Sequence, residues 1–118
     1  NALIAVTPNS AFFAGRTLLF EQEVQIKRII RNPMSIRIGP TTFVAVNTRY
    51  AMSEVCEALI EKYHMPAAAF FQKDPNTWKW SLRGEDVDKS AALYGGGGHP
   101  KAAGFYVDRL DHFDLISP

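Results

Sequence analysis

Four consecutive glycines, Gly95 to Gly98, lie between two core-forming segments and constrain this chain more than any other feature. An ordered glycine loses more backbone freedom on folding than any other residue, so a run of four inside a compact domain needs a reason. Without side chains, successive N–H groups can curl into a concave nest that holds an anion. His99 and Lys101 place an imidazole and a positive charge at the rim of the same loop. We therefore expect a phosphate-binding loop, whereas a flexible linker would continue through serine and other polar residues.

Size and composition indicate one folded domain. The chain has 118 residues, of which 47% are hydrophobic and 21% charged, close to the average for globular proteins. No apolar run approaches the ~20 residues that cross a bilayer, and no signal peptide is recognisable, so we expect no membrane partner. The net charge of +1 gives no global attraction to nucleic acid, so a polyanion must be bound by a local cluster.

The single cysteine, Cys56, excludes an intramolecular disulfide and a cysteine zinc site. It fits a reducing compartment, and we expect a cytoplasmic protein. The sequence starts at Asn1 without a methionine, which indicates a piece of a longer protein.

The first third of the chain predicts a helix and a hairpin. Apolar and charged residues over residues 16–31 follow helical spacing, the end of this segment is basic, and an Asn-Pro pair stops it. A basic helix end is typical of a nucleic-acid surface but more often of a solvated helix face, and we prefer the second interpretation. Two short β-rich runs, residues 35–38 and 42–46, are joined by a Gly-Pro pair and predict a hairpin. Asn47 follows the second run, where its short polar side chain can face a cleft.

The middle of the chain predicts a second helix and a second hairpin. Residues 53–63 carry apolar side chains at helical spacing, with Ser53 as the expected N-cap and His64 at the end. Residues 67–72 and 77–83 flank an Asp-Pro-Asn turn and read as two paired strands.

Alternation along the second strand of that hairpin separates two faces. Trp78, Trp80 and Leu82 share the face that we expect in the core, which leaves Ser81 and Arg83 on the polar face. Since both tryptophans are then in the core, the aromatic residues that remain for base stacking are Phe70, Phe71 and Tyr106.

A short helix over residues 87–94, capped by Asp86, leads into the glycine run. We expect Pro100 to start one helical turn after the loop, and residues 105–107 to form the last strand. Together these elements predict an α/β fold of the α+β kind. It has a mixed sheet of about five strands, two or three helices, and the glycine-rich loop between a short helix and the last strand.

Four side chains from two segments suit a phosphodiester. Ser81 and Arg83 end the polar face of the second hairpin, and His99 and Lys101 flank the glycines. A guanidinium offers bidentate contacts to a phosphate, and glycine amides offer close approach. From spacing alone, a surface pair between Arg83 and Glu85 or Asp86 explains the arginine almost equally well.

The chain resembles the DHH-associated domain, the C-terminal half of DHH-family phosphoesterases such as RecJ-type exonucleases, oligoribonucleases and cyclic-dinucleotide phosphodiesterases. The resemblance extends from about Phe43 to Val107. Its most specific part is the glycine run followed by His99 and then by Ala102-Ala103-Gly104-Phe105, and its supporting parts are Val46-Asn47, Ser81-Leu82-Arg83 and Asp86-Val87-Asp88.

The resemblance implies that this chain grips substrate while another domain cuts it. In the family, an N-terminal DHH domain holds two divalent metal ions, Mn²⁺ or Mg²⁺, that act on the scissile phosphate. The implied phosphate-binding residues here are Asn47, Ser81, Arg83, Gly95, Gly96, Gly97, Gly98, His99 and Lys101, with His99 as a possible assisting residue and no metal ligand in this chain.

The implied organisation has three parts. Residues 1–34 are a connector from the catalytic domain, residues 35–110 are the substrate-binding domain, and residues 111–118 are a C-terminal tail. In that tail, Asp111-His112-Phe113 lacks the second histidine of the Asp-His-His motif and is no metal site.

The implied partners are the DHH domain in the same chain and a short oligonucleotide or other nucleotide phosphodiester, with a homodimer possible. Because the overall charge is low, short substrates are favoured over long strands. The second interpretation is a non-catalytic nucleic-acid-binding module like the C-terminal domain of alanyl-tRNA synthetase, which carries a glycine run but usually no such histidine.

Overall fold

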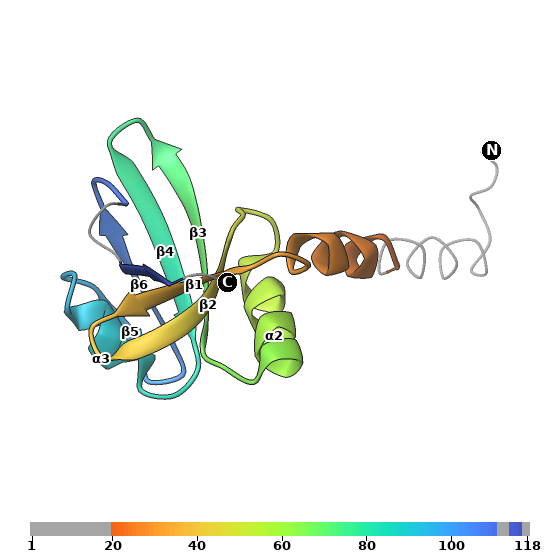
Figure 1. Ribbon diagram of the computed structural model, residues 1–118. Coiled ribbons are helices and arrows are strands. Elements are labelled where there is room, and N and C mark those ends of the chain that lie inside the picture. The colour runs from red at the N-terminus through yellow and green to blue at the C-terminus, as the bar shows by residue number, and fades with distance from the viewer. Residues whose placement is uncertain (1–19, 111–113, 117–118) are drawn as a thin grey trace, which may run out of the picture.

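The computed structural model describes residues 20–110 and 114–116 of the chain, and these residues form a seven-stranded mixed sheet with helices on both faces (Figure 1). The strands are β1 (Met34–Ile38), β2 (Thr41–Asn47), β3 (Ala67–Asp74), β4 (Thr77–Arg83), β5 (Gly97–His99), β6 (Ala102–Val107) and β7 (Asp114–Ile116). Their order across the sheet is β5-β6-β4-β3-β2-β1-β7. The expected α+β class is confirmed, with the short strands β5 and β7 in addition to the five expected ones.

Both expected hairpins are present. β1 pairs antiparallel with β2, and Gly39 in the turn between them has a φ of 61° that favours glycine. β3 pairs antiparallel with β4 around the Asp-Pro-Asn turn, where the Asn76 N–H donates to Asp74 Oδ1 at 3.0 Å. In both hairpins the turn residues that the sequence supplies determine which strands become neighbours.

The helix α2 (Met52–Tyr63) connects β2 to β3, which run parallel. Parallel neighbours require such a crossover, because a tight turn can only join antiparallel strands. The expected N-cap role of Ser53 is wrong: Ala51 is the N-cap residue, in the left-handed region with φ 45°, and no side chain caps the helix. His64 ends α2 as expected, and its N–H donates to Ile60 O at 2.8 Å.

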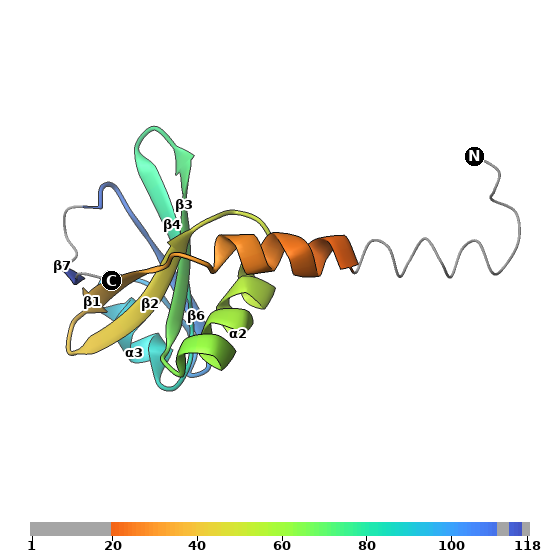
Figure 2. The same cartoon turned by 45° about the vertical axis from the view of Figure 1, so that its right-hand side comes forward.

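Two apolar cores lie on opposite faces of the sheet. α2 and the end of an N-terminal helix, which is helical over residues 20–29, cover one face, and α3 (Val87–Ala92) covers the other (Figure 2). The α3 core contains Ile36, Ile38, Phe43, Ala45, Ala68, Phe70, Trp80, Leu82, Val87, Ala91, Ala103 and Phe105. The α2 core contains Ile30, Val44, Val46, Val55, Cys56, Leu59, Ala67 and Ala69. Strand alternation therefore fixes which side chains face α2.

The chain after α3 differs from the expectation. Asp86 is the N-cap residue of α3, but its side chain makes no capping hydrogen bond. Pro100 starts no helical turn, because β5 folds back on β6 as a tight hairpin through Pro100 and Lys101. β6 is also not the last strand, since β7 from the expected tail pairs antiparallel with β1.

Some expectations fall outside the described residues. The expected helix over residues 16–31 lies outside them in its first four residues. The Asp111-His112-Phe113 segment lies outside them entirely. The expected domain boundaries at residues 34 and 110 remain predictions. Within the described part of the chain, none of the helices combines the length and the apolar character needed to cross a bilayer.

Candidate functional site

Strand register brings Ser81, Arg83 and His99 to one face of the sheet. Residues directly opposite each other in antiparallel strands point to the same side. Arg83 is opposite Ala102, and Ala102 is opposite His99; one row further, Ser81 is opposite Gly104, which is opposite Gly97. We call these six residues the open strip: Ser81, Arg83, Gly97, His99, Ala102 and Gly104.

The open strip lies on the α2 side of the sheet, beside the helix. On β3, the residues opposite Arg83 and Ser81 are Ala67 and Ala69, which are fully buried in the α2 core. α2 packs on β2, β3 and β4, so the part of the same face formed by β6 and β5 extends past the helix. Since Gly97, Ala102 and Gly104 are small, the floor of the strip is nearly bare backbone.

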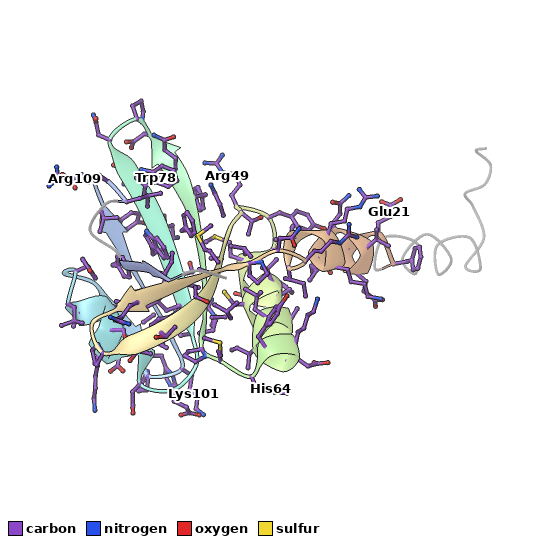
Figure 3. The ribbon with its side chains drawn as sticks, viewed as in Figure 1. Glu21, Arg49, His64, Trp78, Lys101 and Arg109 are labelled. Atoms are coloured by element: carbon purple, nitrogen blue, oxygen red, sulfur yellow. The ribbon has the colours of Figure 1, made fainter. Side chains whose placement is uncertain are left out.

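A groove runs between α2 and the Arg83 end of the strip. From α2 and the segment after it, the lining residues are Glu57, Ile60, His64, Met65 and Pro66; from the sheet side they are Arg83, Gly84, Glu85, Lys101 and Ala102. Two of these lining residues, His64 and Lys101, lie at the lower edge of the molecule in Figure 3. The groove therefore places two basic side chains, Arg83 and Lys101, along one wall.

Arg83 is held in place by neutral partners. Its Nη2 donates to Ser53 Oγ at 2.8 Å, and its Nη1 donates to Leu82 O at 2.9 Å. The surface ion pair with Glu85 or Asp86 that spacing alone allowed is not formed among the described residues, since Glu85 pairs with Lys101. Two of the five guanidinium donors are thus used, and three remain for an anion. The sequence pattern predicts Ser53 as an N-cap and carries no local signal for this contact with Arg83.

His99 has a defined hydrogen-bonding state. Its Nδ1 accepts a hydrogen bond from the Lys101 N–H at 3.1 Å, so in the neutral ring the proton is on Nε2. The side chain is exposed at the edge of the sheet. Nε2–H is therefore a donor available to a ligand on the open strip.

Lys101 lies at the rim of the open strip, as expected, but its ammonium group is paired with a carboxylate. Its Nζ forms a salt bridge with Glu85 Oε1, and both side chains are largely exposed. Such an exposed pair contributes little to stability. A phosphate at the strip has to compete with Glu85 for the lysine.

The expected nest of four glycine amides does not form. The Gly95 N–H donates to Ala92 O at 3.1 Å and the Gly96 N–H to Ala91 O at 3.0 Å, so these two amides end α3. Gly97 and Gly98 belong to the edge strand β5 and pair with β6. Any anion therefore meets the face of a hairpin and not a ring of free amides.

Packing explains two of the four glycines, and backbone conformation explains a third. A Cβ on Gly96 would lie 2.1 Å from Gly104 O, and one on Gly98, whose φ is 144°, would lie 2.8 Å from Ala102 O. Gly95 has a φ of 82°, which side chains rarely adopt. At Gly97 a Cβ would meet nothing within 4 Å, and φ is not left-handed. Of the four glycines, Gly97 alone meets both conditions. Its missing side chain leaves open space on the strip.

Asn47, which the sequence suggested as a binding residue, does not lie on the open strip. By alternation it shares the α3 face with Ala45, and it is opposite Phe70 on β3. Phe70 lies three residues along β3 from the row of Arg83, which is about 10 Å.

Cys56 lies on the buried face of α2 and has no chemical role at this site. Burial raises the pKa of its thiol to about 12, and the nearby Arg83 charge only partly opposes this shift. The thiol is therefore protonated at neutral pH and behaves as an apolar core residue.

The described residues do not fit a divalent metal ion. Among residues 20–110 and 114–116, no group of three or more His, Cys, Asp or Glu side chains lies close enough together to bind one. The site can bind and orient an anion, and we derive no metal-dependent step from it.

Comparison with known proteins identifies one family. The family model described as "DHHA1 domain" matches residues 41–117. A crystal structure of an uncharacterized protein from Helicobacter pylori G27 is similar with a TM-score of 0.49 and 14% sequence identity, over 93% of this chain and 30% of that chain. The present chain thus spans less than a third of the length of that protein. None of the curated proteins matches the chain.

Proposed function

The chain belongs to the DHHA1 domain family, and from this premise we propose that its open strip binds the phosphodiester of a short oligonucleotide or nucleotide substrate. The family is the DHH-associated domain of DHH-family phosphoesterases, so the association with these hydrolases is established at the family level. The proposal assigns substrate binding to this chain. It assigns bond cleavage to a DHH domain elsewhere in the protein, with the divalent ions, Mn²⁺ or Mg²⁺, that the resemblance implies.

The fixed guanidinium of Arg83 is the observation that carries the proposal. A half-buried arginine held by a serine hydroxyl and a carbonyl keeps its positive charge, and it forms no ion pair with a carboxylate among the described residues. Because the guanidinium is already oriented, little side-chain entropy is lost when a phosphate binds. Its remaining donors suit two oxygens of one phosphate.

His99 and Gly97 support the same site from the neighbouring strand. His99 offers Nε2–H on the row of Arg83, and Gly97 leaves open space on the row of Ser81. A phosphate over this bare floor has the Arg83 fork on one side and the imidazole on the other. Lys101 adds charge from the rim when it leaves Glu85.

Binding of a dinucleotide with one phosphodiester, measured by calorimetry on this chain, tests the proposal. Arg83→Ala removes charge-assisted hydrogen bonds worth about 1.5–3 kcal/mol, so the Kd should rise about 10- to 150-fold. Arg83→Lys keeps the positive charge but loses the two parallel donors of the guanidinium. Its Kd should therefore lie between that of wild type and that of Arg83→Ala. Lys89→Ala, an exposed cation on α3 at the opposite face, is the matched control and should leave the Kd unchanged. Equal effects of Arg83→Ala and Lys89→Ala would overturn the proposal.

The enzymatic part is tested in the longer protein that contains the DHH domain. His99→Ala should lower phosphodiester hydrolysis measured with Mn²⁺ or Mg²⁺, and unchanged kinetics would remove His99 from the site. If the longer protein binds the dinucleotide but hydrolyses no phosphodiester with either ion, the non-catalytic nucleic-acid-binding interpretation replaces the enzyme.

A further inference from the structure

The α2 face of the sheet continues beyond the open strip into an aromatic and basic region. One row past Ser81 and Gly104, Lys79 of β4 is opposite Tyr106 of β6 and opposite Phe71 of β3. Lys73 and Arg49 contact these rings from the end of β3 and from the loop after β2. We call these five residues the distal platform: Arg49, Phe71, Lys73, Lys79 and Tyr106. In Figure 3, Arg49 lies in the upper half of the molecule and Lys101 at its lower edge.

Tyr106 is the exposed centre of the distal platform. The Nζ atoms of Lys73 and Lys79 lie 5.2 and 5.9 Å from the centroid of its ring, and 52% of the residue remains accessible. Neither lysine forms a salt bridge with a carboxylate among the described residues. The tyrosine therefore combines an exposed aromatic surface with two lysines that form no salt bridge with a described carboxylate.

Phe71 and Arg49 extend the distal platform on the α2 side. The guanidinium carbon of Arg49 lies 4.5 Å from the centroid of the Phe71 ring, a cation–π contact. Phe70, which the sequence analysis also considered for stacking, faces the α3 core and is only 3% exposed. Of the three aromatics considered for stacking, two therefore lie on the proposed binding face.

We propose that Tyr106 stacks on a nucleobase of a single-stranded oligonucleotide whose phosphate is held at Arg83, while Lys73 and Lys79 bind the backbone phosphates beside that base. This inference rests on the proposed function of the open strip and adds a second subsite to it. Aromatic rings flanked by cations along one groove are the combination that binds single strands, because every base has a face to stack and every linkage has a charge.

The spacing of the two subsites sets the length of the ligand. Arg83 and Lys79 are four residues apart on β4, about 13 Å. This spans up to about four nucleotides that are stacked at about 3.4 Å each, and fewer when the strand is extended. A dinucleotide at Arg83 is therefore too short to use the full distal platform, whereas a tetranucleotide reaches it.

The carboxylates near the distal platform do not outweigh its charge. Asp74 lies in the β3–β4 turn, where its Oδ1 accepts from the Asn76 N–H, and Asp108 follows β6. Arg49, Lys73 and Lys79 outnumber these two groups. The local balance is positive although the net charge of the whole chain is only +1.

The test compares two probes of equal charge: an adenine tetranucleotide and a tetranucleotide of the same backbone without bases. Wild-type chain should bind the adenine probe more tightly, since stacking on one aromatic ring corresponds to a factor of about 5 to 150 in Kd. Tyr106→Ala should abolish this preference and leave the Kd of the abasic probe unchanged. Tyr106→Phe should keep the preference, because the ring remains. Tyr50→Ala, an exposed tyrosine that lines a groove with the N-terminal helix, is the matched control and should behave as wild type.

Charge at the distal platform is tested separately. Lys79→Gln should reduce the slope of log Kd against log salt concentration for either tetranucleotide by about 0.7, the value for one phosphate contact in a single strand. An undiminished preference for the adenine probe in Tyr106→Ala would overturn the inference. If Arg83→Ala still weakens both probes in that case, the proposed function stands without the second subsite; if Arg83→Ala weakens neither, the proposed function itself is wrong.

Discussion

Gly96 and Gly97 are adjacent glycines that the structure assigns opposite roles, so one alanine substitution at each separates packing from binding. A Cβ on Gly96 would lie 2.1 Å from Gly104 O and 2.5 Å from Phe105 Cβ, and these atoms belong to β6 and cannot rotate away. A Cβ on Gly97 would enter open space. Gly96→Ala should therefore disrupt the approach of the chain to β6, whereas Gly97→Ala should leave the fold intact.

The two substitutions should change the free energy of unfolding in opposite directions. Overpacking against rigid neighbours costs about 1–3 kcal/mol, which lowers the Tm of a domain of this size by at least about 4 °C for Gly96→Ala. At Gly97, alanine restricts the unfolded chain without strain and stabilises by up to about 1 kcal/mol. The same methyl group at Gly97 covers the floor of the open strip, so the affinity for a dinucleotide should fall.

Urea unfolding followed by tryptophan fluorescence measures the stability change, because Trp80 is fully buried in the α3 core. Calorimetric titration with the dinucleotide measures binding by each folded variant. A loss of stability in Gly97→Ala as large as that in Gly96→Ala would refute the assignment of roles. So would a Gly97→Ala variant that binds the dinucleotide as tightly as wild type.

Three further predictions follow from individual contacts. Ser53→Ala removes the hydroxyl that holds Arg83 and should raise the Kd for the dinucleotide by about two- to tenfold, less than Arg83→Ala does. A rise in Kd as large as that of Arg83→Ala would mean that Ser53 binds the ligand itself. Glu85→Gln frees the Lys101 ammonium and should lower that Kd by about two- to fivefold with little change in Tm; weaker binding would contradict the assigned competition. Burial raises the folded-state pKa of Cys56 to about 12, above its ordinary value of 9.0, so the unfolded chain releases this proton first as the pH rises. Between pH 9 and 12, urea unfolding should therefore show wild-type stability falling more steeply than that of Cys56→Ala, by up to about 1.4 kcal/mol per pH unit, and parallel curves would contradict this.

The elements with a strong local pattern were predictable from the sequence. The Gly-Pro and Asp-Pro-Asn turns fix both hairpins, and alternation through Trp78, Trp80 and Leu82 correctly leaves Ser81 and Arg83 on the other face. Because strand register follows from the turns, two of the six open-strip residues, Ser81 and Arg83, can be predicted from the sequence of β4.

The parts that depend on distant pairing were not predictable. β5 is three residues long and consists of Gly97, Gly98 and His99, which have no strand pattern; only its pairing with β6 makes it a strand. The glycine amides looked free because the sequence does not show that α3 ends on two of them. Ser53 has the signature of an N-cap, and its contact with Arg83 spans 30 residues of sequence.

Backbone amide shifts on titration of the dinucleotide into the isotopically labelled chain test the central claim most directly. The claim is that a phosphodiester lies on the strip between Arg83 and His99. We predict that the largest changes occur at Ser81, Gly97 and His99, with a shift of the Arg83 side-chain N–H signal, and that the amides of α3 stay unchanged. Unchanged signals at Gly97 and His99, or changes concentrated on α3, would contradict the account.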